Sequence, residues 1–129
     1  MQLALANLEL DKIDEFEAAL SRTLEIDSNH RDALKLLADL NLKQGTYKDA
    51  AQTYTKIISR VPDDLEALLG LGACFFKADD LPTAREVYER ILQIAPGHRL
   101  ATDNLTAIQK KEAQKSVVSD QLSVASGQL

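Results

Sequence analysis

The chain repeats itself with a period of 34 residues, and this repetition constrains its fold more than any other feature. The residues that coincide are those that pack or interrupt helices: Leu34 with Leu68, Leu37 with Leu71, Ala50 with Ala84, Tyr54 with Tyr88, and Pro62 with Pro96. One step earlier, Leu3 falls on Leu37 and Leu20 on Tyr54. A constant period of this length is typical of architectures in which one small unit stacks on the next, since a single unit cannot bury its apolar face.

Composition narrows the class of protein further. The 129 residues include one cysteine, so no disulfide within the chain is available to staple a small secreted fold. The net charge of −5 disfavours a general binder of nucleic acids or anionic membranes. The start lacks a basic segment, and no stretch approaches 18 uncharged apolar residues, so we expect a protein without a signal peptide or membrane span, in the cytoplasm by default.

Each full unit is predicted to be two helices joined by a tight turn. In the second unit Asn29 is expected to cap the first helix and Gly45 to break it. Thr46, with Asp49 three residues later, predicts a capping box for the second helix, which Pro62 ends.

The third unit repeats this order of capping and helix-ending residues. Asp63 is expected to cap its first helix, Asp79 and Asp80 to turn the chain, and Pro82 to lie in the first turn of the second helix. After Pro96 a further helix is expected, with an apolar side formed by three residues: Leu100, Leu105 and Ile108.

These residues resemble the tetratricopeptide repeat, whose pattern combines an early leucine and small residue, a later small and aromatic pair, and a closing proline. The third unit supplies Leu71, Gly72, Ala84, Tyr88 and Pro96. The second matches the pattern except for Asn41 at an aromatic position, and the first is degenerate. The resemblance implies an all-α, right-handed α-solenoid of about three helix-turn-helix repeats plus a C-terminal capping helix. The expected repeat domain covers 1–115, with units at about 1–30, 31–64 and 65–98 and a capping helix at 99–115; the tail 116–129 either extends that helix or is a linker.

Residues with catalytic or metal-binding chemistry are few and far apart. His30 and His98 are two repeat lengths apart, in equivalent turns, and are therefore expected to be helix-start residues on different units. Cys74 aligns with apolar positions and is expected to be a buried core residue. We predict no enzyme activity, no cofactor and no metal.

The resemblance also implies a binding surface, since the first helix of each pair lines the concave side of such a solenoid. The face so assigned has an apolar middle and a mixed-charge rim. We expect its partner-binding residues to be Lys35, Leu36, Asp39, Leu42, Lys43, Glu66, Leu69, Ala73, Phe76, Lys77, Asp103 and Asn104.

Three functions are compatible with this reading. The first is an adaptor or scaffold whose groove holds a peptide or helix of another protein. The second is a self-assembly module that forms homo-oligomers through the groove, the apolar tail or the first repeat. The third is a non-catalytic regulatory segment of a larger enzyme.

One branch of the resembling family grips a peptide's terminal carboxylate with lysine, arginine and asparagine. If the motif is aligned from the first unit, its positions hold Met1, Leu5, Leu36, Glu66 and Gly70. If it is aligned one unit later, they hold Lys35, Asp39, Gly70, Leu100 and Asn104. Only Lys35 fits well, so we predict that the chain is not a carboxylate-clamp partner of chaperones.

Overall fold

The computed structural model describes the backbone of residues 2–127 and the side chains of residues 12–115. Within that range it contains helices and no strands. The helices are α1 (Gln2–Ile26), α2 (Arg31–Gln44), α3 (Tyr47–Arg60), α4 (Leu65–Lys77), α5 (Leu81–Ile94) and α6 (Arg99–Gly127). The predicted all-α helical solenoid is confirmed.

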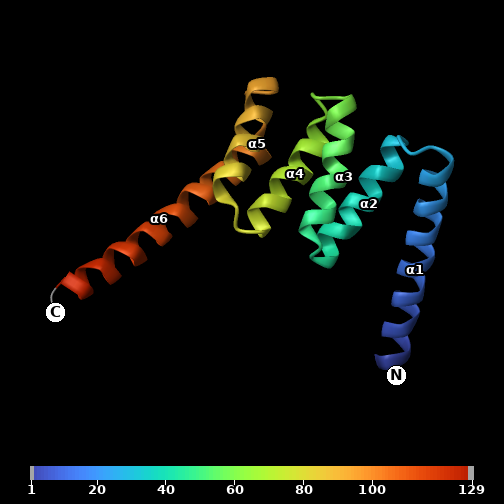
Figure 1. Ribbon diagram of the computed structural model, residues 1–129, viewed down its shortest axis with the longest axis horizontal. Helices are drawn as coiled ribbons and strands as arrows, with labels where there is room; N and C mark the ends of the chain where they lie inside the picture. The colour runs from blue at the N-terminus through green and yellow to red at the C-terminus, as the bar shows by residue number, and fades with distance from the viewer. Residues whose placement is uncertain (1, 128–129) are drawn as a thin grey trace.

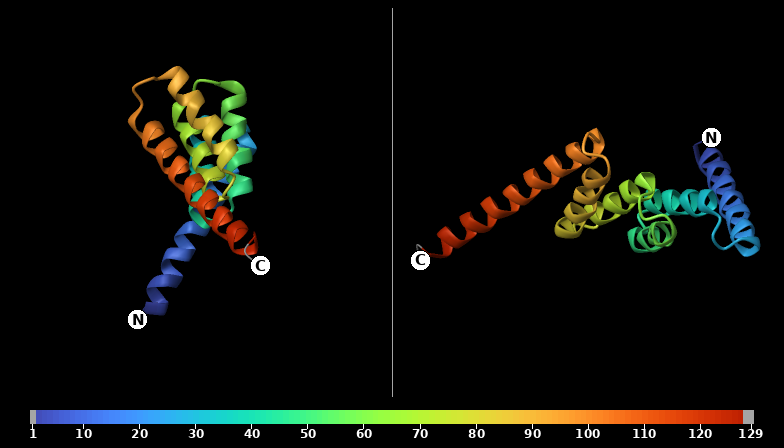
Figure 2. Two further views of the ribbon diagram at one scale, coloured as in Figure 1. Left: turned by 90° about the vertical axis from the view of Figure 1, so that its left-hand side faces the viewer. Right: turned by 90° about the horizontal axis from the view of Figure 1, so that it is seen from above.

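The helices follow one another in a row, each packed mainly on its neighbours in sequence. The pairs α2/α3 and α4/α5 form the centre of this row, and α1 and α6 lie at its two ends (Figure 1). Seen from two further directions, the row is elongated, and the free ends of α1 and α6 run away from the packed pairs (Figure 2).

The first unit differs from the other two because it is one helix of 25 residues instead of a pair. Gly45 ends α2 with a φ of 83°, and Asp79 adopts a φ of 66° between α4 and α5. The position 34 residues before Gly45 is Asp11, where the backbone stays helical. Without a residue that adopts the left-handed conformation there, the chain has no turn and continues as α1.

The same explanation holds at the other end. The position 34 residues after Asp79 is Ala113, a strong helix former, and α6 continues past Lys115 to Gly127. The backbone of residues 116–127 is thus helical, and residues 128–129 of the tail lie outside the described residues.

Three of the predicted caps are wrong in detail. The cap of α2 is His30, whose Nδ1 accepts from the Ala33 amide at 3.1 Å, and not Asn29. The cap of α4 is Asp64, which accepts from the Ala67 amide at 3.2 Å, and not Asp63. At the start of α3, Thr46 stands at the cap position without a capping bond.

The Thr46 hydroxyl donates instead to the Asn41 carbonyl at 3.0 Å, which closes the preceding turn, so no capping box forms. Asp80 caps α5, and Pro82 lies in the first turn of that helix, as the sequence predicts for the proline. At α4 the miss is a choice between two good capping residues, Asp63 and Asp64. At α2 the imidazole of His30 takes the place of the better general capping residue Asn29.

The core consists of two clusters of buried side chains along the row. One is centred on Tyr54 between α2, α3 and α4, and the other on Tyr88 between α4, α5 and α6. Gly72 lets the Tyr88 ring approach, since a Cβ there would lie 2.7 Å from the ring carbon Cζ.

One predicted core position of the last helix is wrong. Leu100 is 58% exposed, and Ala101 is buried in its place beside Ile108. Ala101, Leu105 and Ile108 are spaced four and three residues apart and so share one helical face. Among the described residues, no helix is long and apolar enough to cross a membrane.

Candidate functional site

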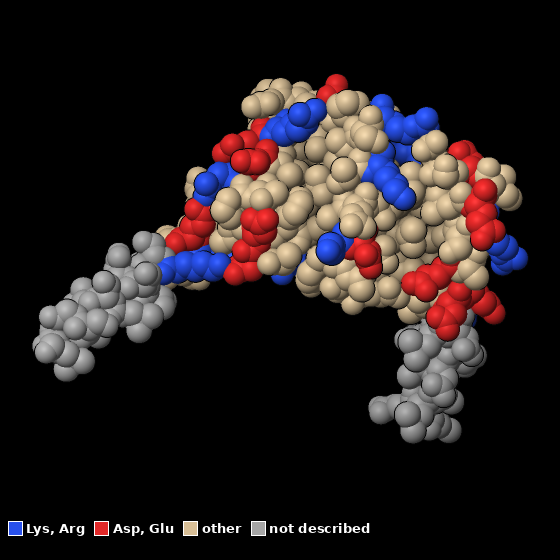
Figure 3. All heavy atoms as spheres, in the orientation of Figure 1, with Lys and Arg blue, Asp and Glu red and all other residues tan. Residues whose placement is uncertain are grey.

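The predicted binding residues lie on α2 and α4, which contact each other directly, and on the adjacent part of α6. We call this surface, formed by the twelve predicted residues, the inner face. Repeat solenoids present extended concave surfaces of this kind for binding. Figure 3 shows the described part of the molecule as one rounded body, with acidic and basic side chains spread among the other residues of the face in view.

The apolar members of the inner face are exposed to different degrees. Leu36 is 44% exposed and stands on the surface of α2. Leu42 packs partly against the first core cluster, and Leu69 and Phe76 pack partly against the second. Leu36 is therefore the most exposed apolar residue of the inner face. Leu69 and Phe76 are partly exposed on this face and also pack against the core.

A hydrogen-bonded group holds the centre of the inner face. Lys35 Nζ lies 2.8 Å from Asp39 Oδ2, and the Tyr54 hydroxyl donates to Oδ1 of the same carboxylate. The bond to Asp39 raises the pKa of Lys35, although burial opposes the shift. Burial is the main cause of the raised pKa of Tyr54, and its bond to Asp39 adds to it. Asp39 is thereby fixed in place while its side chain stays 37% exposed.

Tyr54 reaches this group from α3 because α4 carries Gly70 at the crossing point. A Cβ at Gly70 would overlap the Tyr54 ring, so no larger residue fits without movement. Sequence reasoning assigned Tyr54 to the core, where its ring is, and missed its hydroxyl. Gly70 was the available signal in the sequence. A glycine inside a helix lowers stability, so its presence there suggests that another group packs closely against the helix backbone.

A second group links α2 to α4 at the other end of the inner face. Arg31 binds both oxygens of Asp64 at 2.8 and 2.9 Å and Glu66 at 3.2 Å. The hydrogen bonds from Arg31 hold the pKa of Asp64 below its usual range, against the effect of burial. Asp64 is also the cap of α4, so one carboxylate fixes both the start of the helix and its distance from α2.

The remaining predicted residues lie at the edges. Lys43 and Lys77 are exposed at the ends of α2 and α4, and Ala73 is half-buried between Leu69 and Lys77. Asp103 is exposed and 3.9 Å from Arg99, and Asn104 is half-buried beside it.

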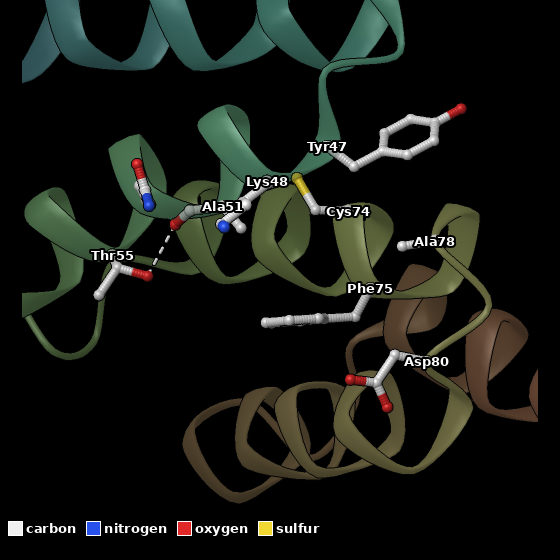
Figure 4. Close-up of a pocket in the computed structure, with 9 residues that line it drawn as sticks. Tyr47, Lys48, Ala51, Thr55, Cys74, Phe75, Ala78 and Asp80 are labelled. Carbon is white, nitrogen blue, oxygen red and sulfur yellow. Dashed lines mark hydrogen bonds between the residues drawn. The ribbon is translucent and has the colours of Figure 1, made fainter.

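Sequence reasoning did not anticipate a hollow on the other side of α4, between α3 and the turn that leads to α5. Its volume is about 560 Å³, and its lining is mainly apolar. Phe75 extends its ring into the space between α3 and α5, and Tyr47 at the start of α3 also lines the hollow (Figure 4).

The hollow has a simple origin in two alanines, Ala51 and Ala78. The residues 34 positions later are Arg85 and Glu112, which form an ion pair between α5 and α6. The same interface is therefore filled by two long side chains in one repeat and left open by two methyl groups in the repeat before. The hollow is therefore a difference in packing between two repeats, and it is not by itself evidence of a binding site.

The residues with reactive chemistry have structural roles. His30 and His98 each accept a backbone hydrogen bond through Nδ1 at the start of a helix, as predicted. Cys74 is buried, as predicted, and burial raises the pKa of its thiol to about 11. Within the described residues no three His, Cys, Asp or Glu side chains gather closely enough to hold a metal ion.

Comparison with known proteins places this geometry in context. A model of the tetratricopeptide repeat matches residues 1–64 and again residues 35–99. The protein CTR9 homolog of Arabidopsis thaliana is 29% identical over 108 residues, which are 83% of this chain and 9% of that protein. The cellulose synthase 2 operon protein C of Komagataeibacter xylinus is 35% identical over 63 residues, 49% of this chain and 5% of that protein. The chain thus spans less than a tenth of these relatives.

Solved structures show the same fold. The first domain of this type in human RPAP3 superimposes with a TM-score of 0.70 at 20% identity, covering 84% of this chain and 87% of that one. The first such domain of Spaghetti (RPAP3), bound to the HSP90 peptide SRMEEVD, gives 0.70 at 19% identity, with 81% and 86% covered. The second domain of human RPAP3, in complex with the HSP70 peptide SGPTIEEVD, gives 0.66 at 22% identity, with 78% and 87% covered.

Proposed function

The chain belongs to the tetratricopeptide repeat family, a fold for protein–protein interaction, and we propose from this premise that its inner face binds a peptide or helix of another protein. The proposed contacts are the twelve residues of the inner face. The proposed role is binding and not catalysis. The solved neighbours that carry peptides support the idea that a fold of this shape accommodates a peptide.

The observation that carries the proposal is the exposure of Leu36 beside polar groups that are already fixed. Leu36 lies one residue from Lys35, whose partner Asp39 is held by Tyr54. Burying the exposed leucine supplies affinity, and a preorganised carboxylate supplies direction at little entropic cost. The ion pairs of Arg31 hold α2 and α4 at a fixed separation, so the face does not have to form when the partner arrives.

We keep the prediction that this face does not clamp a terminal carboxylate as the chaperone-binding branch does. It is supported by the engagement of Lys35 and Arg31 with Asp39, Asp64 and Glu66. A terminal carboxylate placed there would be repelled by the carboxylates of Asp39 and Glu66, which already neutralise Lys35. The peptide SRMEEVD with a free and with an amidated C-terminus is expected to bind with the same affinity, as measured by fluorescence polarisation.

The experiment that tests the proposed function selects peptides from a phage-displayed library of random 12-residue sequences on the wild-type protein. Binding of the selected peptides is then measured for Leu36→Asp and for the matched variant Ile26→Asp. Ile26 is 89% exposed at the end of α1, away from the inner face. We expect Leu36→Asp to weaken binding at least about tenfold, which corresponds to 1.4 kcal/mol, and Ile26→Asp to leave it unchanged.

Circular dichroism accompanies these measurements, because both substitutions are on the surface and should leave the helical content unaltered. Equal binding by Leu36→Asp and wild type would contradict the proposal. So would a selection that enriches no peptide.

A further inference from the structure

We propose that the inner face recognises an acidic, partly apolar peptide segment through a row of three lysines, Lys43, Lys77 and Lys111. The proposal rests on the proposed function and adds the chemical class of the partner. The three lysines follow one another at the repeat period, on α2, α4 and α6 respectively. We call them the lysine row.

The helix dipole accounts for only part of the row. Lys43 and Lys77 lie in the last turns of their helices, where a cation is favourable in any protein. Lys111 lies well inside α6, which continues to Gly127, so no helix end explains it. Its ammonium instead sits over the ring of Phe76, 4.5 Å from the centroid, and so borders an apolar residue of the inner face.

The acidic residues around the row are already engaged. Asp79 binds Lys115 at 2.5 Å, and Glu112 binds Arg85. Asp80 caps α5 by accepting from the Thr83 amide at 3.4 Å. The ion pairs found among the described side chains include neither Lys43 nor Lys77.

The opposite edge of the inner face has the reverse character. Asp32 and Glu66 lie in the first turns of α2 and α4, where they share the single guanidinium of Arg31. A bound segment therefore meets a basic edge on one side and an acidic edge on the other. Carboxylates of the segment are favoured at the lysine row, with its apolar side chains toward Leu36, Leu69 and Phe76.

A peptide fits these features better than a nucleic acid does. The chain carries a net charge of −5, which opposes a long polyanion, and three lysines neutralise only a short acidic stretch. The exposed Leu36 and the half-buried Phe76 also favour a partner with aliphatic or aromatic side chains, which would pack against them.

The test compares peptide selection by three forms of the protein, using the random 12-residue phage library with amidated synthetic copies of the enriched sequences. The first is wild type. The second carries Lys43→Gln, Lys77→Gln and Lys111→Gln. The third is a control of equal charge that replaces three exposed lysines elsewhere: Lys12→Gln, Lys56→Gln and Lys110→Gln.

We expect peptides selected on wild type and on the control variant to be enriched in Asp and Glu, and peptides selected on the lysine-row variant to lose this enrichment. A selected acidic peptide should bind the lysine-row variant about tenfold more weakly, since each exposed ion contact contributes modestly. Replacing Glu by Gln in the peptide should weaken binding to wild type by a similar factor and leave the variant unaffected.

Peptides without acidic enrichment that still depend on Leu36 would overturn the lysine row and leave the proposed function intact. The loss of Leu36 dependence as well would overturn both. A 15-residue uridine oligonucleotide serves as the other polyanion, and lysine-row-dependent binding of it that matches or exceeds the peptide's would also overturn the proposal.

Discussion

At the scale of single residues, two tyrosines and two glycines determine how closely neighbouring helices approach. Tyr54 crosses α4 at Gly70, and Tyr88 crosses it at Gly72, so each aromatic ring occupies the space that a side chain would otherwise fill. The repeat pattern predicts the second pair, because Gly72 and Tyr88 are both pattern positions. The pair of Tyr54 and Gly70 is not part of the repeat pattern, because it depends on the direction in which the Tyr54 side chain extends toward Asp39.

Gly70→Ala is expected to destabilise the protein by about 1 kcal/mol. Overfilling a packed site costs about 1–3 kcal/mol, and the better helix propensity of alanine offsets about 1 kcal/mol of this. Urea unfolding followed by circular dichroism measures the free energy. Gly97→Ala is the control, since a Cβ there meets no atom within 4 Å, and its effect should stay within about 0.5 kcal/mol. A Gly70→Ala protein more stable than wild type would show that the Tyr54 ring does not lie there.

At the scale of elements, the boundaries of helices depend on single turn residues. The sequence predicts the bounds of α2 to α5 because Gly45, Asp79, Pro62 and Pro96 interrupt them. The expectation of about three helix-turn-helix units does not hold for the first unit, where Asp11 stands at the turn position and α1 runs unbroken from Gln2 to Ile26. Alignment transfers a pattern from one unit to another, whereas a turn needs its own residue with the required backbone conformation.

Asp64 has two separable functions in α4, and two substitutions distinguish them. Asp64→Asn removes the ion pair with Arg31 and keeps a good capping residue, whereas Asp64→Ala removes both. We expect Asp64→Ala to lose about 1 kcal/mol more unfolding free energy than Asp64→Asn in urea titrations at pH 7. Equal losses would mean that the cap contributes nothing.

The ion pair of Asp64 also predicts a pH dependence. Its pKa in the folded protein lies below the ordinary value of 3.8, because Arg31 binds the carboxylate. The stabilisation is therefore complete above that ordinary value and is lost as pH falls through the lower pKa of the folded state. Wild type should lose more unfolding free energy than Asp64→Asn between pH 6 and pH 2, and parallel pH profiles would contradict this.

At the scale of the whole molecule, the described helices form a short row whose core is divided into two clusters, and the row ends in a single long helix on each side. The sequence predicts the row, because the repeat period requires stacking. It does not predict the inner face in detail, because exposure there depends on which side chains the neighbouring helices cover. Leu36 is open and Leu69 is partly closed, although both are leucines on equivalent helices.

Truncation after Lys115 is expected to change the unfolding free energy by less than about 0.5 kcal/mol, because the backbone beyond it runs away from α5 (Figures 1 and 2). Truncation after His98 serves as the comparison. It removes the fully buried Ala101 and Ile108 and should abolish cooperative unfolding. A large loss of stability on the first truncation would show that the distal part of α6 packs against the row.

The inner face and the hollow between α3 and α4 lie on different sides of α4, so one measurement separates them. A ¹⁵N-labelled sample is titrated with a peptide selected on the wild-type protein, and the shifts of the backbone amides are followed by NMR. We predict that the largest shifts fall on α2 and α4 at Leu36, Asp39, Leu69 and Phe76 and are lost in Leu36→Asp. Shifts confined to Ala51, Thr55 and Ala78, around the hollow, would contradict the central claim.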